Sequence, residues 1–265
     1  MNRRDFQIAA AAAAAAALLS EGAQAQGMHA EMFHPKLEGP PTQVAMVIFP
    51  GFVTLDLIGP HTFFKALGNV EVRLVSADGA PVRSDTGLIY PADASFATCP
   101  KDLDILFVPG GLKGSIKQMR DPATLDFLAD RGGRAKYITG ICTGTLVLGA
   151  AGLLKGYKAT GNWQVRQLLP LMGAELVPDR VVIDRNRITG AGVTAGIDFG
   201  LQIVAMLRGE PYARMLQLVF EYDPHPPFNS GSPTTASKAL VDHLMTSRAA
   251  DIEAARLAAV ASPAG

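Results

Sequence analysis

Short apolar runs that end in proline or glycine limit the fold of this chain more than any other feature of its sequence. Three of them are VAMVIF at 44–49, LDILFVPGG at 103–111 and the β-favouring YIT at 137–139. An unbroken apolar run is typical of a strand that is buried on both faces, as in a parallel sheet. Because segments with helical spacing lie between these runs, we predict an α/β fold. It should be a flavodoxin-like, doubly wound, mostly parallel sheet with helices on both faces, in a single domain.

The remaining patterns complete this alternation. Further β structure is expected as a strand at 70–76 and as hairpins at 80–90 and 180–190, the second turning at Arg185-Asn186. Helices are expected at 54–67, 124–132, 146–151, 162–173, 192–222 (with a break at 209–211) and 237–260.

The first residues resemble an export signal that is removed from the mature protein. Arg3 and Arg4 precede an alanine-rich stretch at 8–19, and the small-residue motif Ala-Gln-Ala follows at 23–25. A charged start, a short apolar run and such an end are typical of secretory signals, and paired arginines indicate the twin-arginine type. The apolar stretch is shorter than the roughly 20 residues that span a bilayer. We therefore expect a periplasmic protein without stable membrane insertion after processing.

The chain is expected to have four parts: a signal peptide at 1–25, an N-terminal arm at 26–42, the α/β domain at 43–233 and a helical tail at 234–265. Lysine plus arginine and aspartate plus glutamate number 24 each, so the formal net charge is zero. This balance gives no support for nucleic acid or an anionic membrane as a partner. No metal-ligating spacing of histidine, cysteine or aspartate is visible, so neither a metal nor a cofactor is expected.

Two cysteines, Cys99 and Cys142, are present. Two cysteines do not form a disulfide framework, although in an oxidising compartment they could pair with each other. The sequence leaves this pairing open.

Cys142 lies between a predicted strand and a predicted helix, which makes it a candidate nucleophile. The backbone N–H groups of Thr143 and Gly144 are expected near its sulfur. A helix N-terminus there would lower the thiol pKa well below its usual value of about 8.5. A lone cysteine is more often a small buried apolar residue, and the position alone does not decide between the two.

Two other strand ends supply groups that suit a reacting cysteine, because ligands gather at the carboxyl ends of parallel strands. Asp56 follows the first strand and could exchange protons with a neighbouring group, or it could stabilise a helix N-terminus. Gly110 and Gly111 end the central strand, and their N–H groups could stabilise a developing negative charge.

Five stretches carry a resemblance to a known family. They are FPGFVTLDLIGP, LDILFVPGG, GICTGTLVLGAAGLLKGYKAT, ITGAGVTAGIDFGLQIV and FEYDPHPPFNSGSP, which together span about 44–233. The chain resembles the class I glutamine amidotransferase-like superfamily, in the branch that holds deglycases, intracellular proteases and isonitrile hydratases. Within that branch its match to the isonitrile hydratases is close.

The resemblance implies a hydro-lyase that hydrates a small molecule, an isonitrile, to an N-substituted formamide, and it implies a homodimer without a cofactor. It makes Cys142, held in a strained backbone conformation, the nucleophile and Asp56 the general acid and base. Thr143 would donate or accept a hydrogen bond near the reacting centre. The expected oxyanion- or substrate-binding residues are Gly110, Gly111 and Gly144.

One position departs from the family pattern. Asn162 stands where many relatives carry histidine, so we do not expect a Cys–His pair there. Two alternatives to hydration stay open: a stress- or redox-responsive deglycase- or chaperone-like protein with a reactive cysteine, and a ligand-sensing domain of the regulator type. The few residues after 233 and the export signal make the regulator the weaker of the two.

Overall fold

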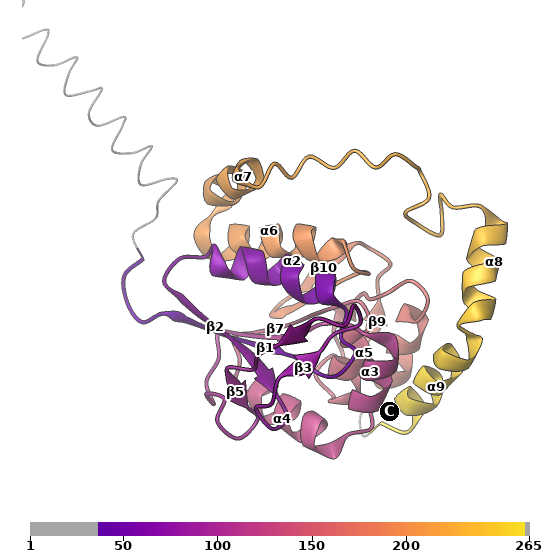
Figure 1. Cartoon of the computed structure of the whole chain (residues 1–265), viewed down its shortest axis with the longest axis horizontal. Coiled ribbons are helices and arrows are strands. Elements are labelled where there is room, and N and C mark those ends of the chain that lie inside the picture. Colours follow the sequence, from indigo (N-terminus) through magenta and orange to yellow (C-terminus); the bar gives the residue numbers. More distant parts are fainter. Residues whose placement is uncertain (1–36, 263–265) are drawn as a thin grey trace, which may run out of the picture.

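The computed structural model describes residues 37–262, and a seven-stranded sheet forms the middle of the molecule (Figure 1). Its strands lie in the order β10-β11-β7-β6-β1-β2-β5. Their bounds are β1 Thr42–Val47, β2 Val70–Ser76, β5 Ala94–Ser95, β6 Ile105–Val108, β7 Tyr137–Ile141, β10 Val181–Asp184 and β11 Arg187–Gly190. In this sheet only the β10–β11 pair is antiparallel. The five inner strands have the 2-1-3-4-5 order of flavodoxin-like folds, so the predicted fold class is confirmed.

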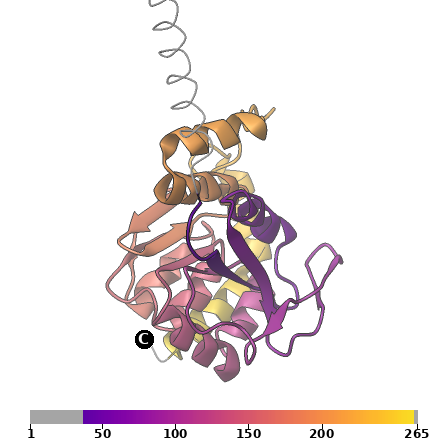
Figure 2. The ribbon, with the colours of Figure 1, turned by 90° about the vertical axis from the view of Figure 1, so that its left-hand side faces the viewer.

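Helices cover both faces of the sheet, as Figures 1 and 2 show. On one face α2 (Thr54–Lys65) packs against α6 (Ala195–Arg208). The opposite face carries α3 (Leu112–Gln118), α4 (Pro122–Gly132) and α5 (Gly144–Ala150). The site described below lies where the strands end between these two layers.

The chain leaves the sheet through α7 (Glu210–Val219), which packs on α6, and then runs as a long exposed segment to α8 (Lys238–Ser247) (Figure 1). After α8, α9 (Ala249–Val260) returns to the body and packs against α3 and α5. The tail therefore brings residues from the far end of the chain close to the middle of the sequence.

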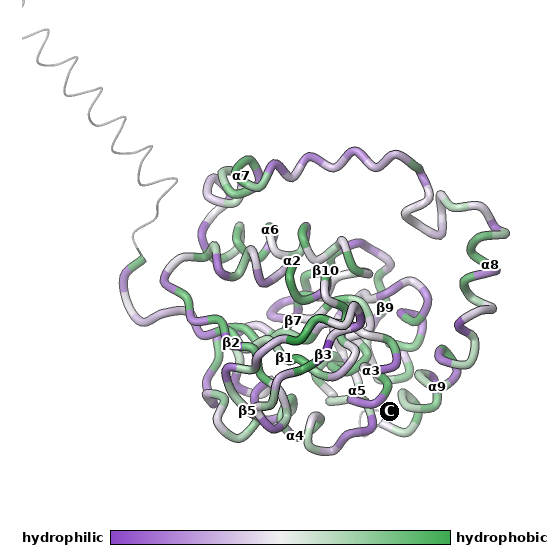
Figure 3. Tube along the Cα trace, viewed as in Figure 1, coloured by the Kyte–Doolittle hydropathy of each residue, from purple (hydrophilic) through white to green (hydrophobic). Residues whose placement is uncertain are grey.

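The core consists of the inner strands and the helix faces that cover them. All of β6 and the last four residues of β1 are buried, and hydrophobic residues follow these strands in Figure 3, whereas the segment between α7 and α8 is largely hydrophilic. Phe64 of α2 meets Phe107 of β6 and Phe199 of α6 edge to face, with ring centroids 5.8 and 6.3 Å apart. These contacts fix α2 over the sheet.

Most predicted elements are present. The two hairpins are β3 (Val82–Arg83) with β4 (Ile89–Tyr90), and β10 with β11, where Arg185 has a positive φ of 54°. The predicted break between helices falls at Gly209, between α6 and α7. A short parallel pair, β8 (Lys158–Ala159) with β9 (Glu175–Leu176), was not predicted.

Three helical segments differ from the predictions. The segment 162–173 forms a 3-10 helix, η1 (Arg166–Met172), in which Pro170 has no N–H for an α-helical hydrogen bond. The predicted tail helix is divided at Arg248 into α8 and α9. Helix α3 is absent from the predictions because its sequence, LKGSIKQ, is short, contains a glycine and a serine, and has no apolar stripe.

The predicted signal peptide at 1–25 and residues 26–36 of the predicted arm lie outside the described residues. Within 37–262, no helix is both long enough and apolar enough to cross a bilayer.

Candidate active site

Cys142 occupies the sharp turn between β7 and α5. Its φ is +57°, a left-handed conformation that is uncommon for a residue with a side chain. The surrounding backbone holds it there, because its N–H donates to the carbonyl oxygens of Gly190 and Ala191 at 3.0 and 3.1 Å. Its own carbonyl oxygen accepts from the Thr145 hydroxyl at 2.9 Å. The strained turn presents the sulfur at the carboxyl edge of the sheet.

Two glycines allow the segments around this turn to approach one another. A Cβ at Gly144 would lie 2.3 Å from the carbonyl oxygen of Val108, and a Cβ at Gly110 would lie 2.7 Å from the Cβ of Cys142. Both distances are shorter than side-chain atoms tolerate, so the two positions need glycine for close packing.

Asp56, in the first turn of α2, is fully buried beside Cys142. Its Oδ2 accepts a hydrogen bond from the Gly110 N–H at 2.9 Å. Its Oδ1 has no partner of ordinary hydrogen-bond geometry among the described residues. Burial raises the pKa of Asp56 to about 7, although contact with the Cys142 thiol and the Gly110 hydrogen bond both oppose the shift. This carboxyl can therefore take up or release a proton near neutral pH.

The Cys142 thiol has a pKa above its ordinary value, contrary to the low pKa that the sequence predicts. Burial is the main cause, and the charge of Asp56 adds to it. Hydrogen bonds from the backbone N–H groups of Thr143 and Val193 to the sulfur oppose the rise without cancelling it. The prediction failed because it counted the helix N-terminus and not the burial and the neighbouring acid.

The N–H groups of Gly110 and Gly111, which were expected to stabilise a developing negative charge, bind side chains of the protein. The Gly110 N–H donates to Asp56, and the Gly111 N–H donates to the Thr143 hydroxyl at 2.8 Å. Both N–H groups are already bonded within the protein, so in this structure they position side chains and do not form the predicted oxyanion site. Thr143 and Val193 supply the N–H groups at the sulfur.

Thr143 contributes its backbone to the sulfur and turns its hydroxyl away. The hydroxyl also shares a hydrogen bond of 2.8 Å with Ser115 of α3. The hydroxyl thus ties α3 to the cysteine turn. The family resemblance implied a hydrogen bond from Thr143 near the reacting centre, and in this structure the hydroxyl makes its hydrogen bonds elsewhere.

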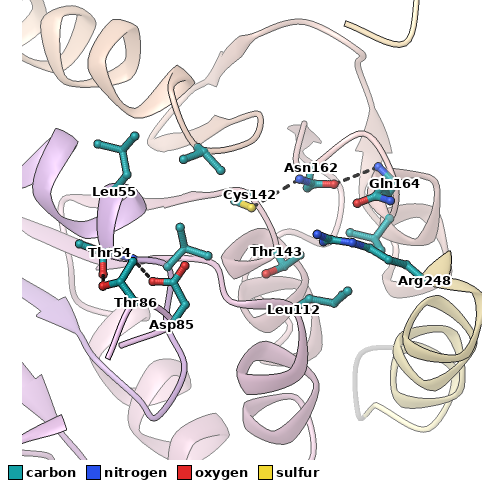
Figure 4. Close-up of a pocket in the computed structure, with 13 residues that line it drawn as sticks. Thr54, Leu55, Asp85, Thr86, Leu112, Cys142, Thr143, Asn162, Gln164 and Arg248 are labelled. Carbon is teal, nitrogen blue, oxygen red and sulfur yellow. Dashed lines mark hydrogen bonds between the residues drawn. The ribbon is translucent and has the colours of Figure 1, made fainter. Parts of the chain in front are cut away.

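Asn162 lies next to the sulfur, at the position where many relatives carry a histidine. Its Nδ2 is 3.6 Å from the Cys142 Sγ, and its Oδ1 accepts from the Gln164 N–H at 3.0 Å (Figure 4). An amide donates a hydrogen bond but cannot carry a proton away. The described residues thus leave Asp56 as the titratable side chain in contact with the thiol.

A cavity of about 440 Å³ opens in front of Cys142 (Figure 4). Its lining residues come from the start of α2, the β3–β4 loop, the start of α3, the cysteine turn, the segment before η1, the loop between β11 and α6, and the tail. They are Val53, Thr54, Leu55, Asp85, Thr86, Leu112, Cys142, Thr143, Asn162, Gln164, Val165, Val193 and Arg248. Asp56 is not among them and contacts the sulfur from the buried side. No pattern in the sequence indicates that Asp85, Gln164 or Arg248 contributes to the cavity, because each contribution depends on segments that meet only in three dimensions.

Cys99 takes no part in this site. Both cysteines are free and buried, so the pairing that the sequence left open is not formed. The backbone oxygen of Cys99 accepts from the buried Arg131 guanidinium at 3.0 Å. In the part of the chain from 37 to 262, no group of three or more histidine, cysteine, aspartate or glutamate side chains is placed to hold a metal.

Comparison with known proteins identifies a family and several similar sequences. The model of the DJ-1/PfpI family matches residues 42–206. The chain is 48% identical to an isonitrile hydratase from Pseudomonas putida over 200 residues, which cover 76% of this chain and 87% of that protein. It is 29% identical to the HTH-type transcriptional regulator CdhR from Pseudomonas aeruginosa, of which it covers only 51%.

A solved structure is similar over most of the chain. The crystal structure of a THiJ/PfpI family protein from Pseudomonas syringae has 48% sequence identity and a TM-score of 0.81. The match covers 85% of this chain and 98% of that one.

Proposed function

The chain belongs to the DJ-1/PfpI family, and we propose that it hydrates isonitriles to N-substituted formamides through a covalent bond to Cys142. The observation that carries the proposal is the buried pair of Cys142 and Asp56, in which the acid has a pKa of about 7 and touches the sulfur. The similarity to the P. putida isonitrile hydratase supports a hydro-lyase with this substrate class.

In the first step, the thiol proton passes to the Asp56 carboxylate while the sulfur attacks the terminal carbon of the isonitrile. Asp56 then delivers this proton to the same carbon. The S–H bond breaks, C–S and C–H bonds form, and a thioimidate results. Because the thiol pKa is raised, transfer of the proton to Asp56 has to accompany the attack of the sulfur on the carbon and not precede it.

In the second step, the Asp56 carboxylate accepts a proton from water, and the water oxygen attacks the thioimidate carbon. Asp56 passes that proton to the imidate nitrogen. As the C=O bond forms and the C–S bond breaks, the hydroxyl proton returns to the sulfur, and the N-substituted formamide leaves. Covalent catalysis in this way divides one difficult hydration into two easier steps.

Replacement of Cys142 tests the scheme directly. We expect Cys142→Ala and Cys142→Ser to lower the rate of formamide production from an alkyl isonitrile by roughly a thousandfold or more, because both remove the attacking thiol. Cys99→Ala is the matched control and should retain activity, since Cys99 lies outside the cavity. The rates are measured by mass spectrometry of the formamide.

Parallel assays with methylglyoxal separate this function from the deglycase alternative. Undiminished hydration by Cys142→Ala would overturn the mechanism. Turnover of methylglyoxal without turnover of any isonitrile would instead favour the deglycase, and turnover of neither would favour a redox or chaperone-like role.

The proposed setting is the periplasm, and the proposed assembly is a homodimer. The paired arginines Arg3 and Arg4 support export, and the family resemblance supports the dimer. The regulator alternative has less support, because the identity to the regulator is 29%, compared with 48% to the isonitrile hydratase.

A further inference from the structure

We propose that Arg248 binds an anionic group at the far end of the substrate, so that the enzyme prefers isonitriles that carry a carboxylate. This inference rests on the proposed function and adds a residue that determines specificity. Arg248 lines the same cavity as Cys142 (Figure 4), although it lies in the tail and beyond the region 42–206 that matches the family.

The tail is fixed on both sides of Arg248, so its position at the cavity is defined. Before it, the carbonyl oxygen of Leu244 accepts from the Gln164 side chain, itself a buried residue of the cavity wall, at 3.2 Å. After it, the carbonyl oxygen of Ala254 accepts from Arg120 at 3.0 Å. Three alanines of α9 are also buried in the body of the protein: Ala255, Ala258 and Ala259. The division of the predicted tail helix at Arg248 places this side chain between two anchored helices.

Among the described residues, the Arg248 guanidinium has no ion-pair partner. Within residues 37–262, no carboxylate lies within salt-bridge distance of it, whereas its tail neighbours Lys238 and Arg256 each pair with an acid on their own helix. Figure 4 shows the Arg248 side chain extending from the tail toward the cysteine turn. A guanidinium matches a carboxylate with two parallel hydrogen bonds.

The two sides of the cavity carry opposite charges. Asp85, in the β3–β4 loop, lines the other side of the cavity, and its Oδ1 already accepts from the Thr54 N–H at 2.8 Å. A carboxylate would be repelled by Asp85 and attracted by Arg248. A substrate with its isonitrile carbon at Cys142 would therefore place its anionic end toward the tail.

Short ω-isocyano carboxylates and their methyl esters test the proposal. We compare 3-isocyanopropanoate, its methyl ester and 2-isocyanoethylamine as substrates of the full chain, of Arg248→Gln and of Arg248→Lys. Arg256→Gln is the matched control, because Arg256 is on α9 but does not line the cavity. For the wild type we expect kcat/KM for the acid to exceed that for the ester by roughly tenfold at low salt, with a smaller ratio at high salt.

Arg248→Gln should lose this preference, so that kcat/KM for the acid falls roughly tenfold further than kcat/KM for the ester, and Arg248→Lys should keep part of the preference. Equal acid-to-ester ratios in the wild type and Arg248→Gln, or a preference for the amine, would overturn the proposal. If the wild type hydrates none of the compounds, the proposed function fails. In that case calorimetric binding of 3-formamidopropanoate and its methyl ester decides the Arg248 inference: roughly tenfold weaker binding of the acid to Arg248→Gln supports it, and equal binding overturns it.

Discussion

Two acids, Asp56 and Cys142, are buried in contact with each other, and this contact determines how either can ionise. The charge of Asp56 adds to burial in raising the thiol pKa, whereas the contact with the thiol opposes the rise that burial causes in the pKa of the carboxyl. A carboxyl with one oxygen held by Gly110 and the other without a partner suits a group that gains and loses a proton during a reaction. The same arrangement has a consequence for stability that does not depend on which reaction the protein catalyses.

The folded chain keeps a proton on Asp56 up to pH about 7, whereas the unfolded chain releases it near 3.8. Wild-type stability should therefore fall as the pH rises from about 4 to 7 and then level off. Asp56→Asn keeps an oxygen for the Gly110 N–H and removes this titration. We expect the variant to be more stable than the wild type above pH 7, by at most about 4 kcal/mol, and to lose this advantage near pH 4.

Thermal denaturation at pH 4.5 and pH 8 measures the effect. Asp126→Asn, at an exposed site on α4, is the control and should show the same difference from the wild type at both pH values. A stability gain for Asp56→Asn that did not change with pH would contradict the raised pKa.

Among the elements, the β7–α5 connection depends most on close backbone packing. Helix α5 is buried along its whole length, and it starts against the carbonyl groups of Val108 and Pro109 at the end of β6. These carbonyls are backbone atoms of a core strand, so they cannot move aside as a flexible side chain can.

Gly144→Ala should therefore be strongly destabilising. Its Cβ would lie 2.3 and 2.5 Å from those two carbonyl oxygens, and overpacking of this kind costs roughly 1–3 kcal/mol, or a fall in Tm of several degrees. Gly59→Ala in α2 is the control: its Cβ would find ordinary contacts, the nearest at 3.6 Å, so that variant should be neutral or slightly stabilised. Equal melting temperatures for both variants would contradict the packing at Gly144.

In the molecule as a whole, the sheet order brings together groups from distant parts of the chain. The ends of β1, β6, β7 and β11 meet at one edge, where they supply or support Asp56, Gly110, Cys142 and Val193. The tail adds Arg248 to the same cavity. The site therefore combines residues from four strand ends with one residue of the docked tail.

The proposed export belongs to the whole chain as well. We expect replacement of Arg3 and Arg4 by lysine to leave the protein in the cytoplasm, because the twin-arginine receptor reads the arginine pair. Cell fractionation with immunoblotting measures this, with a cytoplasmic enzyme as the marker. Unchanged recovery from the periplasmic fraction would contradict the twin-arginine assignment.

Local patterns in the sequence were enough to predict the α/β class, the two hairpins and the position of Cys142 between strand and helix. Apolar runs, turn residues and flanking glycines act over a few residues, so they can be read directly. The position of Asp56 and Cys142 after strand ends also followed, because parallel strands end at a common edge, but only the family resemblance implied that the two act together.

Only the tertiary structure decided the chemistry of the site. The raised pKa values, the use of Gly110 and Gly111 to position side chains, and the N–H of Val193 at the sulfur all depend on burial and contacts between segments far apart in the chain. The same holds for Arg248, whose cavity position follows from how the tail docks. A sequence pattern records neither desolvation nor the distance between remote charges, and these two quantities fix how a buried thiol and its acid behave.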